Sequence, residues 1–433
     1  DISGFAATNP GTAVAAATEE AGPMGLLGAA CHSPPELVIR QSMQLGRRQP
    51  FICWQVDLWG ASTDGTPDGQ RVWVEATVNR VLEMSALVHR FDVGGNVSTM
   101  ATPLNNIADI PSNPPTLQPM AYAVIKATGG LETTADRDGN FNFVGLDQSV
   151  DLTVEYRNPY VNVDDLHPSG NGDHTITIPG QPGSTNLIVL NPVPDEFTTA
   201  EANAYQVVNH VGDFIRDYGS STGELLPTIQ PWTSQTSGSC GGNALDPVVN
   251  VFASGSGCVN TAFGTILTHE VGHILNHRYW GSAFSDLFNE GNADVWAMYV
   301  CDTPCLRSPG FLQDTCIRSG TESVLFCGDL FPACDGSTLS HNQGATWRTA
   351  AWSVRDELNQ SLGDEAGDLV ANSLFLAWME AYNQTKIRAQ IQIEWLLLDD
   401  DDGDLSNCTP HYDQIRAGFA AHAYPDPCLT GCQ

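Results

Sequence analysis

The sequence predicts a multidomain α+β protein, with β-rich domains in its first half and a mainly α domain in its second half. The chain has 433 residues, which exceeds one ordinary domain and suits two or three. Apolar and polar residues alternate as in strands over much of residues 37–191. From Thr198 onward, apolar residues recur at helical spacing instead, as at Val207 and Val211.

The N-terminal part divides into a leader, a β-rich region and a linker. Residues 1–36 are rich in Ala, Gly and Thr, which predicts a flexible leader. Residues 37–101 alternate like strands and are expected to be β-rich. Within them, Arg71–Leu82 resembles the strand–turn–strand in the propeptides of thermolysin-like and fungalysin-like peptidases, which implies a propeptide-like region. Residues 102–119 are rich in Pro and Asn and predict a linker.

Residues 120–195 predict a second β domain. Its expected strands are 121–127, 140–144, 151–156 and 187–190. The turn Asp138-Gly139-Asn140 supplies the positive φ angles that a tight hairpin needs. The surrounding run, 133–143, resembles the hairpin of carboxypeptidase-regulatory-like β-sandwiches. That resemblance implies a small β-sandwich that serves as a spacer or packing domain.

Residues 196–433 predict a mainly α domain. Helices are expected at 346–362, 363–383, 387–397 and 410–422. One strand-like run, 247–253, lies within this domain.

Acidic residues greatly outnumber basic ones. The chain has 50 Asp plus Glu against 18 Lys plus Arg, a formal net charge of -32. Such a surface repels phosphate backbones and anionic bilayers, which argues against nucleic acid as a partner. No apolar run approaches the ~18 residues of a membrane span, so no span is expected.

Twelve cysteines indicate disulfide chemistry. The expected short loops are Cys240–Cys258, Cys301–Cys305, Cys316–Cys327 and Cys428–Cys432. The sequence has none of the C-x-x-C pairs typical of zinc ribbons. Because disulfides form in oxidising compartments, we expect a secreted or cell-surface protein.

The strongest chemical signal is the run HEVGH at 269–273. On a helix, His269 and His273 lie one turn apart on the same face, so both imidazoles can reach one zinc ion. Glu270 lies beside them, where it can take a proton from a water on the metal. The flanking residues are apolar, and two histidines buried in such a helix are costly unless they bind something.

A second helical pattern supplies candidates for the third protein ligand of a catalytic zinc site. In the run NEGNAD, residues 289–294, Glu290 and Asp294 lie one turn apart. One carboxylate can bind zinc while the other accepts a hydrogen bond from a ligand imidazole. His277, two turns beyond His269, is the strongest rival ligand.

HEVGH and NEGNAD together resemble the gluzincin metallopeptidases, the group that includes thermolysin and fungalysin. The resemblance implies a thermolysin-like zinc peptidase domain at 196–433. It implies that His269, His273 and Glu290 bind the metal and that Glu270 is the general base.

The same resemblance implies two supporting residues. Asp294 would hold the first ligand histidine and Asn289 the second. The metzincin pattern HExxHxxGxxH fits less well, because Asn276 stands where its Gly belongs and Tyr279 where its third His belongs.

The run that contains Asn243 and Ala244 resembles the edge strand with which gluzincins align the substrate backbone. Pairing to a strand edge binds peptides with little sequence preference, which suits a peptidase. The alternative is a purely structural strand between two cysteines.

The run SHNQG at 340–344 resembles the segment that carries the oxyanion-stabilising histidine of thermolysin and fungalysin. It implies this role for His341, with Asp335 as a partner that keeps it protonated. The alternative is that His341 only caps the helix beginning near Ala345.

Consecutive carboxylates at 399–402 predict a calcium loop, in which Asp400, Asp402 and Asp404 alternate as calcium ligands do. No Glu follows at the place of a bidentate ligand. The alternative is a solvated run that caps the helix beginning near Pro410.

We therefore expect a secreted zinc-dependent endopeptidase that acts on proteins or peptides. The alternative is a non-catalytic zinc-containing surface or binding protein, although a purely structural site has no use for a base at Glu270. A third class, a carbohydrate-adhesion protein, is suggested by the β-sandwich alone.

Overall fold

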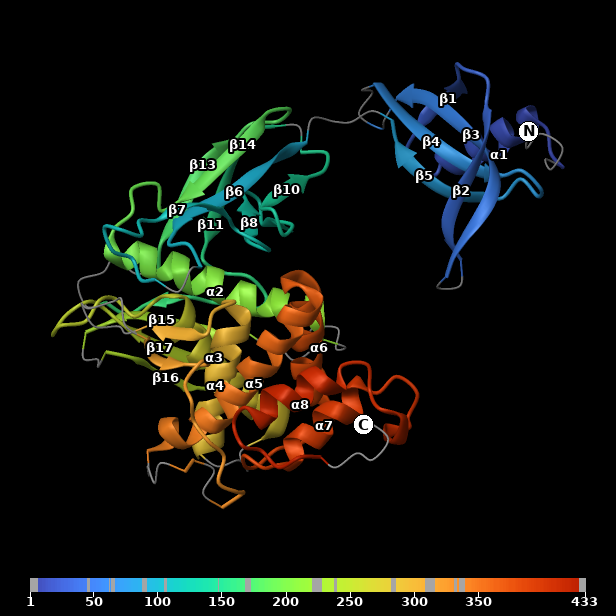
Figure 1. Ribbon diagram of the computed structural model, residues 1–433. Helices are drawn as coiled ribbons and strands as arrows, with labels where there is room; N and C mark the ends of the chain where they lie inside the picture. The colour runs from blue at the N-terminus through green and yellow to red at the C-terminus, as the bar shows by residue number, and fades with distance from the viewer. Residues whose placement is uncertain are drawn as a thin grey trace. The chain divides into compact units, whose positions relative to one another are not determined.

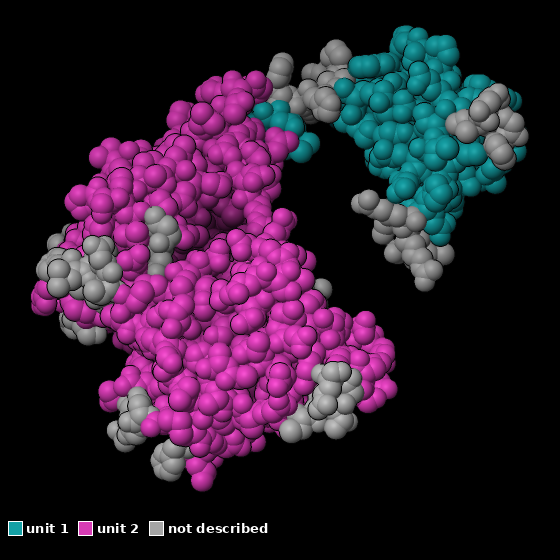
Figure 2. Space-filling view, in the orientation of Figure 1, with its two compact units in different colours: residues 1–93, 143–148 teal, residues 94–142, 149–433 magenta. Residues whose placement is uncertain are grey.

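The computed structural model of the chain contains two compact units (Figures 1 and 2). It describes residues 7–44, 47–61, 63, 67–87, 92–104, 107–146, 148–167, 173–219, 228–236, 240–281, 286–307, 316–330, 333–334 and 339–427. Unit 1 comprises residues 1–93 and 143–148, and unit 2 comprises residues 94–142 and 149–433. Helices and strands are both abundant, as expected for an α+β protein.

Unit 1 is built on a five-stranded antiparallel sheet of order β1-β3-β4-β5, in which β2 also pairs with β3. The strands are β1 Leu27–Cys31, β2 Glu36–Gln44, β3 Arg47–Ala61, β4 Pro67–Glu75 and β5 Val81–Ala86. The long β3 holds both neighbours on one edge, because its first part pairs with β2 and its last part with β1.

The expected flexible leader instead contains helix α1 (Pro10–Ala21) and strand β1. The Asn9 side chain caps the helix, and proline occupies its first position. Three alanines at four-residue spacing are fully buried in the core of unit 1: Ala13, Ala17 and Ala21. Their small side chains let the helix pack closely on the sheet, so a composition that suggested a leader forms part of the core.

Unit 2 begins with two four-stranded sheets, one of order β10-β6-β14 with β7 on β6, and one of order β13-β11-β8-β9. The strands are β6 Val93–Ala101, β7 Thr116–Pro119, β8 Val124–Ala127, β9 Leu131–Thr134, β10 Asn140–Phe143, β11 Val150–Glu155, β13 Thr175–Gly180 and β14 Thr185–Leu190. The hydroxyls of Thr99 and Tyr156 share a buried hydrogen bond of 2.7 Å that joins the two sheets.

These sheets draw on more of the chain than residues 120–195. Strand β6 ends the region expected at 37–101, and β7 ends the linker expected at 102–119. Both pair within unit 2, because β6 lies between β14 and β10 and also carries β7. The start of this β domain is therefore determined by strand partners far along the chain and not by local composition.

Helix α2 (Glu196–Tyr218) lies against these sheets (Figure 1). It contacts them through buried polar side chains. The Tyr205 hydroxyl donates a hydrogen bond of 2.7 Å to the carbonyl of Ala121, and the Asn158 amide donates one of 2.8 Å to Asn209. The same helix packs against α3 and β15, so it links the sheets to the helical part of unit 2.

A further sheet in unit 2 has the order β12-β15-β17-β16. Its strands are β12 Asp164–Asp165, β15 Gln230–Gln235, β16 Gly242–Leu245 and β17 Val248–Phe252. Strand β17 confirms the strand expected at 247–253. It pairs with β15 in parallel and with β16 in antiparallel orientation, which leaves β16 at an edge of the described sheet.

Helices dominate the rest of unit 2. They are α3 Gly264–Trp280, α4 Asp286–Val300, α5 Ser340–Leu362, α6 Asp364–Ala381, α7 Gln390–Asp399 and α8 Tyr412–Ala420. The four helices expected between 346 and 422 are confirmed. Four fully buried tryptophans lie in the core of α4 to α7: Trp296, Trp347, Trp378 and Trp395.

Glycines let α3, α4 and α5 approach closely. A Cβ atom on Gly272 would lie 3.0 Å from the Cα of Ala293, and one on Gly291 would lie 2.5 Å from the carbonyl oxygen of Gly344. These contacts join α3 to α4 and α4 to α5. Side chains from all three helices can therefore converge.

The disulfides correct part of the expected pairing. Cys240–Cys258 is confirmed. Cys305 pairs with Cys316, across the hairpin of β18 (Cys305–Arg307) and β19 (Cys316–Ser319), and Cys327 pairs with Cys334. The expected Cys301–Cys305 and Cys316–Cys327 pairs are therefore wrong, because the hairpin brings together cysteines that spacing alone did not single out.

The remaining described cysteines include both free thiols and a disulfide-bonded residue. Cys31, Cys53 and Cys301 are free thiols, and Cys408 is disulfide-bonded. The expected Cys428–Cys432 pair lies outside the described residues. No helix within the described ranges is both long and apolar enough to cross a membrane.

Candidate metal centre

Helix α3 carries the first three candidate residues. His269 and His273 lie on successive turns, and Glu270 follows His269. His269 and Glu270 are only 5% and 6% exposed. Buried apolar residues on the same helix surround these polar groups, so they need partners.

Three side-chain atoms from α3 and α4 converge. Nε2 of His269 lies 3.2 Å from Nε2 of His273 and 3.3 Å from Oε2 of Glu290. Nε2 of His273 lies 3.6 Å from the same oxygen. Zinc binds such atoms tetrahedrally at about 2.0–2.2 Å, which places neighbouring ligand atoms about 3.3–3.6 Å apart. The three atoms therefore fit one face of a zinc tetrahedron.

The Oε2 atom of Glu290 is buried and makes no hydrogen bond of good geometry, although imidazole nitrogens surround it. A buried carboxylate oxygen without a hydrogen bond is unusual in a folded protein. Burial opposes ionisation of Glu290, but the imidazoles of His269 and His341 hold its pKa well below the usual range. This ionised oxygen therefore fits a metal cation.

Asp294, one turn beyond Glu290 on α4, contacts the other nitrogen of His269. Its Oδ1 lies 2.8 Å from Nδ1 of the ring, and the residue is fully buried. Arg318 donates to both carboxylate oxygens at 3.0 and 2.9 Å, and Arg348 donates to Oδ2 at 3.1 Å. Burial opposes ionisation, but the charge of Arg318 and the contact with His269 hold the pKa of Asp294 well below its usual range. The carboxylate can thus orient the ring.

The pKa values of the two histidines are shifted in opposite directions. Burial lowers the pKa of His269, but the close carboxylates of Asp294 and Glu290 outweigh it and raise the pKa to about 9. Burial and the charge of His269 lower the pKa of His273 to about 4. Because metal-binding imidazoles are neutral, a cation bound here would favour the deprotonated form of His269.

His341 joins the group from the first turn of α5. Its Nε2 lies 3.0 Å from Oε2 of Glu290, and its ring stacks on that of His269 with 6.2 Å between centroids. Ligand atoms of these three residues lie within 4.8 Å of one another. The helix begins at Ser340 without a side-chain cap, so the alternative of His341 as a helix cap is not borne out. Its expected partner Asp335 lies outside the described residues.

A cleft with a volume of about 620 Å³ opens over these residues. Strand β16 forms one wall, with Asn243 and Ala244 in it, and α3 forms another. Burial raises the pKa of Glu270, and a Cβ atom on Gly242 would lie 2.8 Å from its Oε1. The strand edge thus passes directly over this carboxylate.

The other expected residues surround the group. Asn289 interacts with His273, which partly offsets the lowering of the histidine pKa, and accepts a hydrogen bond of 2.9 Å from Asn276. His277 lines the cleft but does not join the clustered ligand atoms. The rival assignment of His277 as the third ligand stays a prediction.

The acidic loop differs from the expected calcium set. Ligand atoms of Asp400, Asp401 and Asp402 lie within 4.8 Å of one another. Asp404 instead accepts a hydrogen bond from the backbone of Ser406, at the start of a 3-10 turn (Leu405–Asn407). Calcium binding by Asp400, Asp402 and Asp404 stays a prediction.

Arg318 and Arg348 were not identified from the sequence. Arg348 did have a signal, because it is a lone cation in the apolar helical run ATWRTAAW. A cation in such a position needs a buried anion. Arg318 lies in a short hairpin and had no comparable signal.

The sequence matches no known protein-family model. A search of curated proteins finds none with significant similarity.

Proposed function

We propose that the protein is a zinc-dependent endopeptidase of the gluzincin type. The observation that carries the proposal is the triangle of Nε2 of His269, Nε2 of His273 and Oε2 of Glu290, with sides of 3.2–3.6 Å beside a buried carboxylate. Zinc held by these residues would polarise the scissile carbonyl and lower the pKa of a water molecule. A purely structural zinc site is normally closed by four protein ligands and does not face a cleft.

Glu270 then acts as the general base. It takes a proton from the attacking water and passes it to the leaving amine. Burial raises its pKa, which favours proton acceptance over an ordinary exposed glutamate. His341 donates from Nε2 to the carbonyl oxygen as negative charge develops on it.

Substrate would bind as an extended chain along β16. This strand lies at an edge of the described sheet, and the wall of the cleft includes Asn243 and Ala244. Backbone pairing selects for an extended peptide rather than for particular side chains. The disulfides agree with function in an oxidising compartment, and we propose that the protein is secreted.

Metal content and hydrolysis test the proposal together. Purified protein should contain one zinc per chain, cleave an unfolded protein substrate, lose that activity on chelation and regain it with zinc. Tight zinc binding without any cleavage of proteins or peptides would instead support the non-catalytic zinc protein. Activity that persists with zinc confirmed absent would rule out the mechanism.

Gly242→Ala should lower kcat with little loss of stability. The new Cβ would lie 2.6 Å from Cγ of Glu270 and displace that side chain. A misplacement of about 1 Å can cost about 10²-fold in rate. The matched control is Gly255→Ala, which meets no atom within 4 Å. Equal kcat values for both variants would show that β16 does not constrain the base.

A further inference from the structure

Arg348, on the third turn of α5, is 2% exposed and donates hydrogen bonds to four residues in three segments of the chain. Nη1 donates to Oδ2 of Asp294 at 3.1 Å and to the carbonyl of His341 at 3.2 Å. Nε donates to the carbonyl of Ser319 at 3.3 Å, and Nη2 donates to Glu322 at 2.5 Å. Its planar, always-charged guanidinium suits such simultaneous contacts.

Two of these partners belong to different halves of the site. Asp294 holds the ring of His269, which contributes one corner of the ligand triangle. The His341 carbonyl belongs to the residue whose ring reaches Glu290. A single Nη1 atom therefore bridges the orientation of a metal-binding imidazole and the position of the facing histidine.

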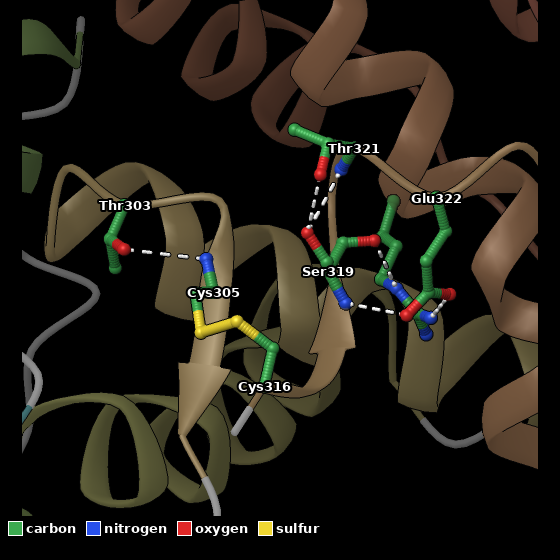
Figure 3. Close-up of a disulfide and its surroundings, with 7 residues drawn as sticks. Thr303, Cys305, Cys316, Ser319, Thr321 and Glu322 are labelled. Carbon is green, nitrogen blue, oxygen red and sulfur yellow. Dashed lines mark hydrogen bonds and ion pairs between the residues drawn. A yellow bond between two sulfur atoms is a disulfide. The ribbon is translucent and has the colours of Figure 1, made fainter. Parts of the chain in front are cut away.

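The other two partners keep the guanidinium in place. Ser319 ends β19, and its backbone N–H donates to Glu322 at 2.8 Å, so both partners are tied to each other (Figure 3). The Cys305–Cys316 disulfide closes the hairpin in which Ser319 lies (Figure 3). The same hairpin carries Arg318, the second cation on Asp294. The hairpin that holds the Arg348 guanidinium is thus itself cross-linked by a disulfide.

We propose that Arg348 is a positioning residue that holds the His269–Asp294 pair and His341 in one fixed arrangement. The inference rests on the proposed peptidase function for its kinetic effect and on the metal site alone for its effect on zinc binding. Arg348 touches neither the metal position nor the cleft, since it is absent from the residues that line the cleft. Its action is therefore indirect.

Arg355, seven residues further along α5, provides a matched control. It is 1% exposed and likewise donates to two carboxylates, those of Asp368 and Asp302, and to one carbonyl, that of Tyr299. None of these partners touches the candidate site. Arg355→Met therefore has the structural consequences of removing a buried arginine without disturbing His341 or Asp294.

The experiment compares Arg348→Met with Arg355→Met in zinc affinity, by competition with a chelator, and in kcat and KM at saturating zinc. We expect Arg348→Met to weaken zinc binding about 10-fold and to lower kcat about 10–100-fold with KM unchanged, as for other residues that orient ligands. Arg355→Met should leave zinc affinity and kcat unchanged. Thermal melts of both variants report the purely structural cost.

A double-mutant cycle with His341→Ala tests whether Arg348 affects kcat through His341 or through the His269–Asp294 pair. If Arg348 acts on kcat by placing His341, then Arg348→Met should cost little further in kcat once His341 is replaced. Equal effects of Arg348→Met and Arg355→Met on zinc affinity and kcat would overturn the inference. If Arg348→Met fails to fold, Arg348→Lys serves instead, because it keeps the buried charge but cannot reach all four partners. A Lys variant with wild-type zinc affinity and kcat would equally overturn it.

The two proposals fail differently. A wild-type protein that binds zinc but cleaves no peptide refutes the peptidase, while the zinc affinities of the arginine variants still decide the role of Arg348. A wild-type peptidase whose Arg348 and Arg355 variants behave alike refutes only the positioning role.

Discussion

Glu270→Gln should nearly abolish turnover while the metal stays bound. The amide has the shape of the carboxylate but cannot accept the proton of the attacking water. Loss of a general base typically costs about 10²–10⁴-fold in rate. We expect kcat to fall by this factor at unchanged zinc content, since the triangle of His269, His273 and Glu290 does not include Glu270.

The control for this prediction is Glu365→Gln, which removes an exposed carboxylate from the first turn of α6. Rates are measured on a quenched peptide, and zinc is quantified in the same samples. A Glu270→Gln enzyme with full zinc and wild-type kcat would mean that another group serves as the base. Loss of zinc in this variant would mean that Glu270 supports the metal rather than the reaction.

Much of the site could be predicted because its signals are local. His269 and His273 share one helix face at a spacing of one turn, and Glu290 and Asp294 repeat that spacing on the next helix. A spacing of four residues on a helix determines which side chains face the same way. The residues that meet across α3 and α4 were therefore visible in two short runs of sequence.

The residues that hold the site together were harder to predict because their partners are distant in sequence. Arg318 reaches Asp294 from a two-stranded hairpin, and Arg348 reaches it from α5. Neither pairing follows from a periodicity. The Cys305–Cys316 pairing was missed for the same reason, since the hairpin rather than the spacing of cysteines selects it.

The domain boundaries were also hard to predict from the sequence, because they depend on partners distant in the chain. Strand β6 was assigned to the N-terminal region by its position in the sequence, yet it pairs with β14 in parallel, from Gly94 opposite Thr185 to Thr99 opposite Leu190. Residues 1–36, which contain helix α1, were expected to be flexible because they are rich in Ala, Gly and Thr. The buried face of α1 is nevertheless made of alanine, where larger side chains would hold the helix away from the sheet.

Asp294→Asn should strongly lower the free energy of unfolding. Glu290→Gln should leave it nearly unchanged. Asp294 is fully buried between Arg318 and Arg348, and breaking a buried ion pair from one side costs about 3–5 kcal/mol. The folded-state pKa of Asp294 lies below its unfolded value, so its contribution is fully present above the unfolded pKa of about 3.9 and is lost as the pH falls further. The stability gap between wild type and Asp294→Asn should therefore be largest at neutral pH and narrow in acid.

For zinc affinity we expect the opposite ranking of the two variants, with a larger loss from Glu290→Gln than from Asp294→Asn. Glu290→Gln removes the anionic corner of the ligand triangle, whereas Asp294→Asn leaves all three ligand atoms and only weakens the orientation of His269. Replacing an orienting partner typically costs about 10–100-fold in metal affinity, and losing a ligand should cost more. Asp368→Asn is the matched control, because it removes a carboxylate from buried Arg355 without touching the site. Chelator competition and thermal melts on the three variants decide the roles. Equal losses of zinc affinity from Glu290→Gln and Asp294→Asn would mean that Glu290 is not a ligand, and a larger loss from His277→Ala would assign that place to His277.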